Sequence, residues 1–236
     1  MWGRPFEAAA GLMPGVTRPS DERRPKGRRQ AESLTPLYPA ITIFPYPPLQ
    51  WEAFMRLFFG LDLPAETVGS LEAMVDRLRP TARIQWSHPS NLHITTKFVG
   101  EWPDERLAEM RAAAAAIAPR RPIQVHVRRV GFFPNPHAPR VFWCGIEAPG
   151  LEDLARDTDR ATAALGVAPE ARGFSPHLTL ARIKERPNLQ PLREAIAALP
   201  SLDAGQFEAS CFFLYRSQLQ PTGSVYTKLA EFPLSK

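Results

Sequence analysis

Cysteine is scarce in this chain, and no long apolar run occurs in it. The two cysteines, Cys144 and Cys211, lie in separate segments without a Cys-x-x-Cys pair, which favours buried thiols in a reducing compartment over disulfides. No apolar stretch approaches the ~20 residues that a membrane-spanning helix needs. The first residues include Arg4 and Glu7 and lack the apolar centre of a signal peptide. We therefore expect a soluble cytoplasmic protein with no membrane partner.

The motifs that mark several enzyme classes are also missing. There is no Gly-x-Ser-x-Gly turn for a nucleophilic serine, no Gly-x-x-x-x-Gly-Lys loop for triphosphates and no Gly-x-Gly-x-x-Gly turn for dinucleotides. The five histidines are scattered, without the His-x-x-x-His or cysteine-rich spacing of metal sites. We expect neither a metal ion nor a cofactor.

Positive charge is modest and comes mostly from arginine. The net charge is +5, the isoelectric point is near 9.6, and only five residues are lysine. This bias favours anionic ligands without demanding nucleic acid. With 236 residues, 44% of them hydrophobic, the chain can fill the core of one large domain or of two lobes.

Residues 1–54 differ in composition from the rest. They hold nine of the 26 prolines and a charged cluster over 21–29, which predicts a largely disordered extension. A folded domain is expected over 55–236. Two other interpretations of the extension stay open: its basic cluster contacts RNA, or translation begins at Met55, where recognisable structure starts.

From residue 56 onward, strand and helix patterns alternate. Strands are predicted over 56–63, 83–88, 91–100, 123–133, 140–147, 175–183, 207–215 and 225–232, and helices over 65–78, 104–117, 151–165 and 191–199. The connections mix short hairpins with crossovers, which favours an α+β fold over a doubly wound one. We expect two pseudo-symmetric lobes of mainly antiparallel sheet, with outer helices, around a central cleft.

The strand over 91–100 contains the first of two motifs. A period of two places His93, Thr95 and Lys97 on one face. The other face would carry mostly apolar residues: Leu92, Ile94, Thr96 and Phe98. Lys97 has two interpretations, since it either faces a phosphate or caps the rim of the strand.

The second motif repeats this pattern over 175–182. His177 and Thr179 share a face, and the aliphatic residues that alternate with them point the other way. Arg182 falls on the opposite side from His177 unless the strand bends. A single His-x-Thr in a strand is usually structural, but the repeat in the same apolar register favours a function. The histidines without such an echo are interpreted as surface or structural residues: His88, His126 and His137. For His88 a second interpretation stays open, since it is close enough in sequence to the first motif to flank the cleft.

Two imidazoles and two hydroxyls suit displacement at a phosphodiester. Because imidazole titrates near neutral pH, one ring can accept a proton from the attacking oxygen while the other donates one to the departing oxygen. Threonine hydroxyls can hydrogen-bond the non-bridging oxygens, which carry the charge that must be stabilised as the bond breaks. The pattern therefore predicts metal-independent acid–base catalysis by the two histidines.

The chain resembles the two-histidine phosphoesterase superfamily, and within it the RNA 2',3'-cyclic phosphodiesterases once called 2'-5' RNA ligases. The resemblance runs from about Met55 to the C-terminus. It rests on the order and spacing of six stretches: 56–64, 91–101, 174–182, 214–219, 223–226 and 232–234.

The resemblance implies that a monomer hydrolyses an RNA 2',3'-cyclic phosphate to a 2'-phosphomonoester without a metal. It assigns protonation of the departing ribose 3'-oxygen to His93 and activation of water to His177. Thr95 and Thr179 would hold the phosphate oxygens, and Arg182 matches a family arginine credited with phosphate contact. The implied partners are RNA ends or nucleoside 2',3'-cyclic phosphates.

Two alternative functions stay open. The same histidines could join tRNA halves through a 2'-5' bond, although water at ~55 M favours hydrolysis. The chain could instead be a binding module for RNA ends with silent histidines, which the presence of both complete motifs disfavours.

Overall fold

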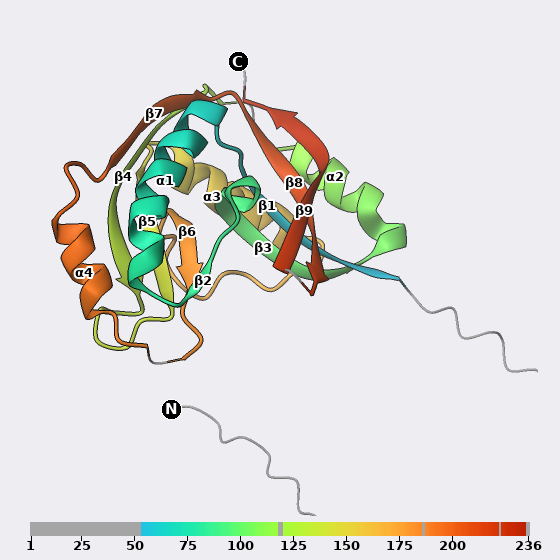
Figure 1. Ribbon diagram of the computed structural model, residues 1–236. Helices are drawn as coiled ribbons and strands as arrows, with labels where there is room; N and C mark the ends of the chain where they lie inside the picture. The colour runs from blue at the N-terminus through green and yellow to red at the C-terminus, as the bar shows by residue number, and fades with distance from the viewer. Residues whose placement is uncertain (1–52, 118–119, 186, 222, 235–236) are drawn as a thin grey trace, which may run out of the picture. The chain divides into compact units, whose positions relative to one another are not determined.

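Nine β-strands pair into one antiparallel sheet in the computed structural model of the chain (Figure 1), which describes residues 53–117, 120–185, 187–221 and 223–234. The strand order is β7-β4-β5-β6-β3-β1-β8-β9, and β2 pairs with β6 outside this path. The strands are β1 (Phe54–Leu61), β2 (Gln85–Trp86), β3 (Ile94–Pro103), β4 (Ile123–Phe133), β5 (Val141–Glu147), β6 (His177–Arg182), β7 (Asp203–Ala209), β8 (Cys211–Gln220) and β9 (Gly223–Pro233).

The strand order divides the sheet into two halves. We call β3, β1, β8 and β9 the β1 half, and β6, β5, β4 and β7 the β5 half. The halves meet where Ile94 of β3 pairs with Leu178 of β6. Both of these side chains are fully buried, so the residues next to them in each strand point to the other face of the sheet.

Two of the four helices each pack against the half of the sheet that does not contain the strand before them. The four helices are α1 (Ala65–Leu78), α2 (Leu107–Ala115), α3 (Leu151–Ala163) and α4 (Gln190–Ala197). α1 follows β1 in the chain but packs against β7 and α4, whereas α3 follows β5 but packs against β3 and α2 (Figure 1). Each half is therefore covered by the helix that follows a strand of the other half.

α1 illustrates why the predicted helices form. Its buried positions recur at helical spacing and lie on one face: Thr67, Leu71, Met74, Val75 and Leu78. Pro80 comes two residues after its end, where a proline can no longer break a helical hydrogen bond. The predicted bounds of 65–78 are confirmed.

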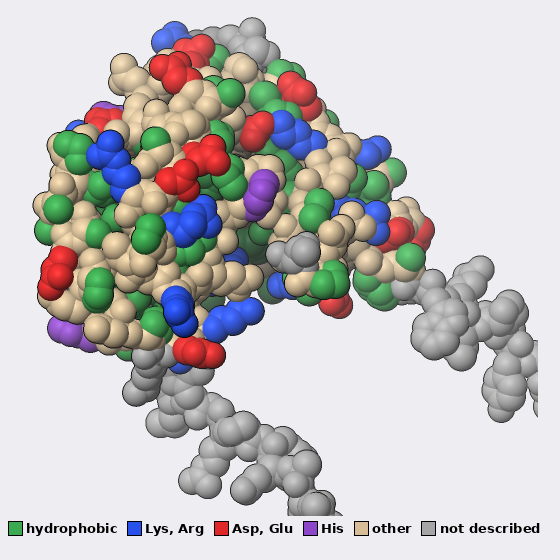
Figure 2. Space-filling view, in the orientation of Figure 1, with side chains coloured by type: hydrophobic (Ala, Val, Ile, Leu, Met, Phe, Trp, Pro, Cys, Tyr) green, Lys and Arg blue, Asp and Glu red, His purple; other side chains and the backbone are tan. Residues whose placement is uncertain are grey.

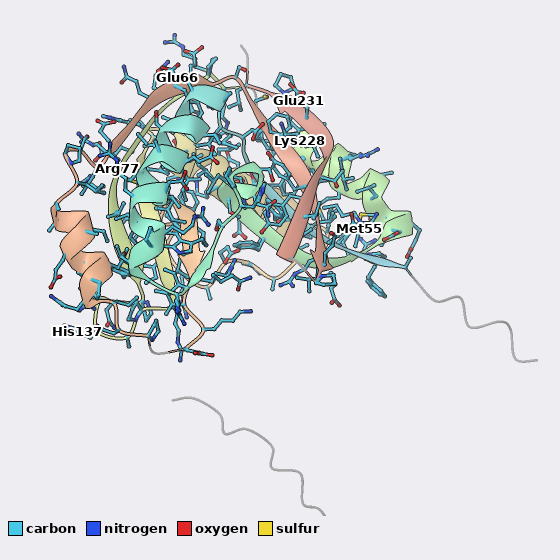
Figure 3. The ribbon with its side chains drawn as sticks, in the orientation of Figure 1. Met55, Glu66, Arg77, His137, Lys228 and Glu231 are labelled. Carbon is cyan, nitrogen blue, oxygen red and sulfur yellow. The ribbon has the colours of Figure 1, made fainter. Side chains whose placement is uncertain are left out.

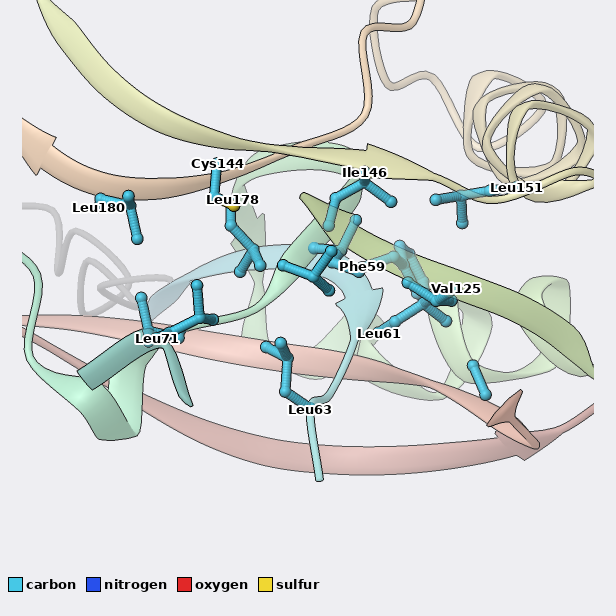
Figure 4. Close-up of a cluster of buried hydrophobic side chains, with 14 of the residues drawn as sticks. Phe59, Leu61, Leu63, Leu71, Val125, Cys144, Ile146, Leu151, Leu178 and Leu180 are labelled. Carbon is cyan, nitrogen blue, oxygen red and sulfur yellow. The ribbon is translucent and has the colours of Figure 1, made fainter. Parts of the chain in front are cut away.

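The core joins the helices to both halves of the sheet. Figure 4 shows Phe59 and Leu61 of β1 in the same cluster as Leu71 of α1 and Leu178 of β6, and all four side chains are 0% exposed. Burial of each such side chain stabilises the fold by about 1.5–3 kcal/mol relative to leaving it in water. Apolar packing on the buried face of the sheet thus stabilises the junction of the two halves.

The predicted α+β class with mainly antiparallel sheet is confirmed, but one predicted strand is wrong. The segment 207–215 contains two strands, β7 and β8, which separate at Ser210. β7 pairs with β4, and β8 pairs with β1 and β9, so the chain crosses between halves at Ser210. Both strands contribute to one core, which is why their apolar residues read as a single run.

The extension predicted over 1–54 lies outside the described residues, apart from Ala53 and Phe54. β1 begins at Phe54, one residue before the boundary expected from the sequence. Within the described ranges, no helix is both long enough and apolar enough to cross a membrane.

Candidate active site

The first motif histidine lies directly before β3 and is held by its own backbone. His93 is half-buried, and its Nδ1 lies 2.7 Å from the carbonyl oxygen of Asn91. A carbonyl can only accept, so Nδ1 carries a proton and donates it, which leaves Nε2 as the basic nitrogen of the neutral ring. The hydroxyl of Thr95 lies 2.9 Å from that Nε2. The reactive nitrogen therefore faces a hydroxyl on the same side of the strand.

The second motif histidine is held in the same way. His177 opens β6, and its Nδ1 lies 2.7 Å from the carbonyl oxygen of Ser175. The same reasoning gives the same tautomer, with Nε2 left for chemistry. In both motifs, the carbonyl two residues before the histidine thus orients the ring and fixes which nitrogen is basic.

The sheet brings the two motifs together at the junction of its halves. Continuation of the antiparallel register beyond Ile94 and Leu178 sets His93 opposite Thr179 and Thr95 opposite His177. Directly opposite residues of neighbouring strands lie roughly 5 Å apart at their Cα atoms. The two histidines and two threonines predicted from the sequence are therefore neighbours on one face of the sheet.

Burial lowers the pKa of His93 below its ordinary value, although its hydrogen bond to the Asn91 carbonyl raises it. Electrostatic interactions with His177 and with the Arg182 guanidinium lower this pKa further, and the carboxylate of Asp62 raises it. In the free protein at neutral pH, the His93 ring is therefore mostly neutral. An anion bound between these groups would stabilise the charged ring.

A β-bulge interrupts each motif strand at the same place. Against β1, Thr95 and Lys97 pair with consecutive residues, so Thr96 is the extra residue of β3. Against β5, Thr179 and Ala181 pair with consecutive residues, so Leu180 is the extra residue of β6. Each extra residue shifts the alternation of the side chains that follow it by one position.

The burial of the two strands follows this shared geometry. From His93 to Phe98 and from His177 to Arg182, the side chains are in turn half-buried, buried, half-buried, buried, buried and exposed. The two motif strands therefore repeat each other in three dimensions as well as in sequence, and their exposed ends return to the face of the histidines.

The bulge overturns the predicted position of Lys97. Its side chain lies on the face away from His93 and is buried, with Nζ 2.6 Å from a carboxylate oxygen of Asp159 and 2.8 Å from the carbonyl oxygen of Ala168. Lys97 therefore neither faces a phosphate nor caps the rim of the strand. The period of two fails there because Thr96 adds a residue to the strand.

The second bulge decides the position of Arg182, which the alternation alone set apart from His177. Arg182 is exposed, and its charge acts on His93. Figure 2 shows Lys and Arg side chains spread over one face of the molecule, with a few of them at its lower edge. Arg182 thus shares the side of the sheet that holds the histidines.

Aromatic rings surround His93, and sequence reasoning did not place them there. The centroid of its ring lies 4.6 Å from that of Phe58 and 5.0 Å from that of Tyr226. Tyr215 stacks on Phe58 at 4.9 Å. The alternation of residues along β1 does not distinguish a ring under the sheet from one beside the site, so the position of Phe58 next to His93 could not be predicted from the sequence.

The ring next to His177 comes from a different strand. Phe133 of β4 lies edge-on to it, with centroids 5.0 Å apart. The two histidines share a tautomer and a register, but their apolar neighbours differ between the halves.

Two polar contacts tie the β8–β9 hairpin to the first motif. The side-chain amide of Asn91 donates to the carbonyl oxygen of Ser224 at 2.6 Å. Lys228 of β9, labelled in Figure 3, pairs with Asp62 just after β1. The hairpin is thus fastened beside His93 and also positions the acidic group that raises its pKa.

The three remaining histidines do not join this group of catalytic candidates. His126 pairs with Asp203 at 2.8 Å, and His88 contacts the hydroxyl of Ser90 at 2.7 Å. His137 is exposed on the connection between β4 and β5 (Figure 3). Among the described residues, no three His, Cys, Asp or Glu side chains are grouped to hold a metal ion.

The chain matches one family along most of its described length. The family model described as LigT like phosphoesterase matches residues 61–143 and 146–226. The RNA 2',3'-cyclic phosphodiesterase of Methanocaldococcus jannaschii is 33% identical over 178 residues, which cover 75% of this chain and 100% of that protein. The protein of the same name from Thermus thermophilus is 34% identical over 188 residues, which cover 76% of this chain and 90% of that protein.

Solved structures have the same fold. The TT0787 protein of Thermus thermophilus superposes with a TM-score of 0.64 at 32% identity, covering 76% of this chain and 98% of that one. E. coli LigT complexed with 3'-AMP superposes with a TM-score of 0.62 at 27% identity, covering 78% of this chain and 100% of that one.

Proposed function

Because the chain belongs to the LigT-like phosphoesterase family, we propose that it hydrolyses RNA ends bearing a 2',3'-cyclic phosphate to 2'-phosphomonoesters. The observation that carries the proposal is the pair of matched imidazoles on adjacent strands, each with Nδ1 held by a carbonyl and Nε2 left as the basic nitrogen. The printed names of several relatives support the choice of substrate.

In the proposed reaction, water attacks phosphorus while the bond from phosphorus to the ribose 3'-oxygen breaks. His177 accepts the proton from the water, and His93 donates a proton to the departing 3'-oxygen. The product keeps its phosphate on the 2'-oxygen, and exchange of protons with solvent returns both rings to their starting states. Proton transfer by positioned groups contributes about 10²–10⁴-fold to such reactions.

The threonines and the arginine would stabilise the charge on phosphorus. Thr95 donates to His93 when the ring is neutral and can turn its hydroxyl to a non-bridging oxygen when phosphate enters. Thr179 has the matching position in β6, and Arg182 supplies positive charge from the same face. Hydrogen bonds aimed at the developing charge are worth several kcal/mol in the transition state.

The lowered pKa of His93 fits a proton donor that is charged by its substrate. The free ring is disfavoured as a cation mainly by burial, and the guanidinium of Arg182 adds to this effect. A phosphate anion beside Arg182 offsets that positive charge and so favours protonation of His93. The acid would thus be loaded when the substrate binds.

Hydrolysis of nucleoside 2',3'-cyclic phosphates in the presence of EDTA tests the proposal. We expect turnover with the chelator present, and loss of ~100-fold or more in kcat for His93→Ala and for His177→Ala. His137→Ala removes an exposed histidine and serves as the matched control. Near-normal rates in either motif variant would rule out the assigned roles, and loss of activity to EDTA would rule out metal-independent catalysis.

The monomeric state and the cytoplasmic location expected from the sequence stay predictions. Light scattering on the purified full chain checks the first, and fractionation of cells that express it checks the second.

A further inference from the structure

Ser87 contacts the bulge of β6 from the end of β2. The short strand β2 lies beside β6 in the sheet, where Trp86 pairs with Ala181 (Figure 1). Ser87 is the next residue of the chain, so the antiparallel register sets it opposite Leu180. Leu180 is the extra residue of β6 relative to β5. The chain therefore leaves β2 at the point where β6 bulges.

Two hydrogen bonds join Ser87 to consecutive carbonyls of β6. Its backbone N–H donates to the carbonyl oxygen of Leu180 at 2.8 Å, and its hydroxyl donates to the carbonyl oxygen of Thr179 at 2.7 Å. In a regular strand, successive carbonyls point to opposite edges, so one residue of a neighbouring strand does not reach both. A bulge disrupts this alternation. The pair of bonds from Ser87 therefore stabilises the bulged form of β6 over a regular strand.

The bulge decides which face of the sheet receives Arg182. Leu180 and Ala181 are both buried, and the exposed side chain of Arg182 follows on the side of the histidines. A shift of one residue in a strand moves every later side chain to the other face. Without the extra residue, Arg182 would lie on the face away from His177. Its position beside the site thus depends on the geometry that Ser87 stabilises.

We propose that Ser87 is a positioning residue, which holds the bulge of β6 and so keeps the guanidinium of Arg182 beside the phosphate. The serine hydroxyl has one hydrogen to donate, and the carbonyl of Thr179 accepts it. Ser87 therefore acts through Arg182 and donates no hydrogen bond to the substrate. The inference rests on the proposed hydrolysis of cyclic phosphates and adds a residue from outside both motifs.

Ser87→Ala separates the two bonds. The variant keeps the backbone N–H that donates to Leu180 and loses the hydroxyl that donates to Thr179. A backbone carbonyl that loses its partner away from water is destabilised. The bulged form of β6 should therefore become less populated in this variant without unfolding of the chain.

Steady-state hydrolysis of adenosine 2',3'-cyclic phosphate by the full chain tests the inference. We expect Ser87→Ala to lower kcat/KM ~5-fold, the effect of one hydrogen bond, and Arg182→Gln to lower it at least ~10-fold. Adding Ser87→Ala to Arg182→Gln should cause no further loss, because no guanidinium is left to position. Ser87→Thr keeps the hydroxyl and should retain the kcat/KM of wild type.

Thr81→Val is the matched control. Thr81 is also half-buried, and its hydroxyl donates to the carbonyl oxygen of Leu78 at 2.7 Å, away from β6. The variant should keep the kcat/KM of wild type. Ser87→Cys is a second variant if the alanine protein is unstable. Its thiol is a weak donor, so its kcat/KM should fall between those of Ser87→Ala and wild type.

Two measurements without turnover separate this inference from the proposed function. Binding of inorganic phosphate should weaken ~5-fold in Ser87→Ala, and no further when that change is added to Arg182→Gln. NMR titration should show a raised pKa of His93 in Ser87→Ala, because a displaced guanidinium lowers that pKa less, while His177 and Asp62 still act on it. If both shifts occur but wild type hydrolyses no cyclic phosphate, the proposed function alone is wrong.

Four results would overturn the role of Ser87. They are wild-type kcat/KM and phosphate binding in Ser87→Ala, an equal loss in Thr81→Val, a loss in Ser87→Thr as large as in Ser87→Ala, and a further loss when Ser87→Ala is added to Arg182→Gln. The last result would show that Ser87 affects the site by a route other than Arg182.

Discussion

The ammonium of Lys97 lies 2.6 Å from the carboxylate of Asp159, on the face of β3 away from His93. Asp159 belongs to α3 and also accepts from the backbone N–H of Glu170 at 3.1 Å. The ammonium also lies 2.8 Å from the carbonyl oxygen of Ala168 and 3.5 Å from a carboxylate oxygen of Glu170. This pair therefore links the strand of the first motif to the segment that leads into the second.

Lys97→Met should lower the free energy of unfolding by about 2–4 kcal/mol. The substitution keeps the apolar stem and leaves the Asp159 carboxylate without its partner; that carboxylate is 25% exposed, so water reduces the loss. Urea unfolding measures it. Arg156→Met breaks an exposed ion pair with Asp153 on the same helix and should cost under ~1 kcal/mol. Equal losses in the two variants would show that the buried pair has no special weight.

The pH dependence of kcat/KM should reveal His93 as the acid. In the proposed mechanism the protonated form of His93 is the active one. Because its pKa is lowered, kcat/KM should fall as pH rises through a midpoint below 6.5, the ordinary value for histidine. Arg182→Gln removes a charge that lowers this pKa, so the midpoint should move to higher pH even though the rate falls.

Lys184→Gln is the control for this shift, because it removes an exposed positive charge that is not among the groups acting on His93. Its midpoint should stay in place. If the midpoint of Arg182→Gln does not move relative to this control, the assignment of His93 as the proton donor is wrong.

Gly60→Ala should disturb the site through the backbone. A Cβ at Gly60 would lie 2.6 Å from the carbonyl oxygen of Ile94, so β3 has to shift beside His93. We expect a loss of about 1–3 kcal/mol of stability and slower turnover. In Gly69→Ala the new Cβ meets nothing within 4 Å, and stability should rise by about 0.5–1 kcal/mol because Gly69 lies inside α1. Thermal unfolding and initial rates measure both, and equal behaviour would contradict the tight approach of β1 to β3.

Thr95→Val should affect turnover, whereas Thr96→Val should affect stability. The first removes the hydroxyl beside His93 and should lower kcat ~10-fold or more with little change in stability. The second removes a buried hydroxyl that has no partner among the described residues, so it should leave kcat unchanged and stabilise the fold by about 1 kcal/mol. A loss of kcat in Thr96→Val alone would show that the bulge has been assigned to the wrong face.

The α+β class of the fold and the placement of both motifs on strands could be predicted from the sequence, and the chemistry of the motifs stays a prediction. His93 and His177 were identified because a repeat of two residues survives up to the threonine of each motif. Beyond that point the alternation failed because of the bulges at Thr96 and Leu180. No residue type in the sequence marks either bulge. Lys97 was therefore assigned to the wrong face.

Contacts between distant strands could not be read from local patterns. The run around Ser210 is continuous in the sequence, although its two parts pair with different halves of the sheet. Phe58 and Tyr226 come from strands far apart in the chain, and only the pairing of β1, β8 and β9 sets both beside His93. A single sequence offers no signal for such pairing.

α1 and α3 each pack against the half of the sheet that does not contain the strand before them, so the two halves depend on each other. A cut in the connection between β4 and β5 would leave α1 on a fragment that lacks the strand it packs against, and α3 on one that lacks β3. Neither fragment could bury its own apolar surface alone. The two imidazoles are therefore assembled only when both fragments of such a cleaved chain are present together.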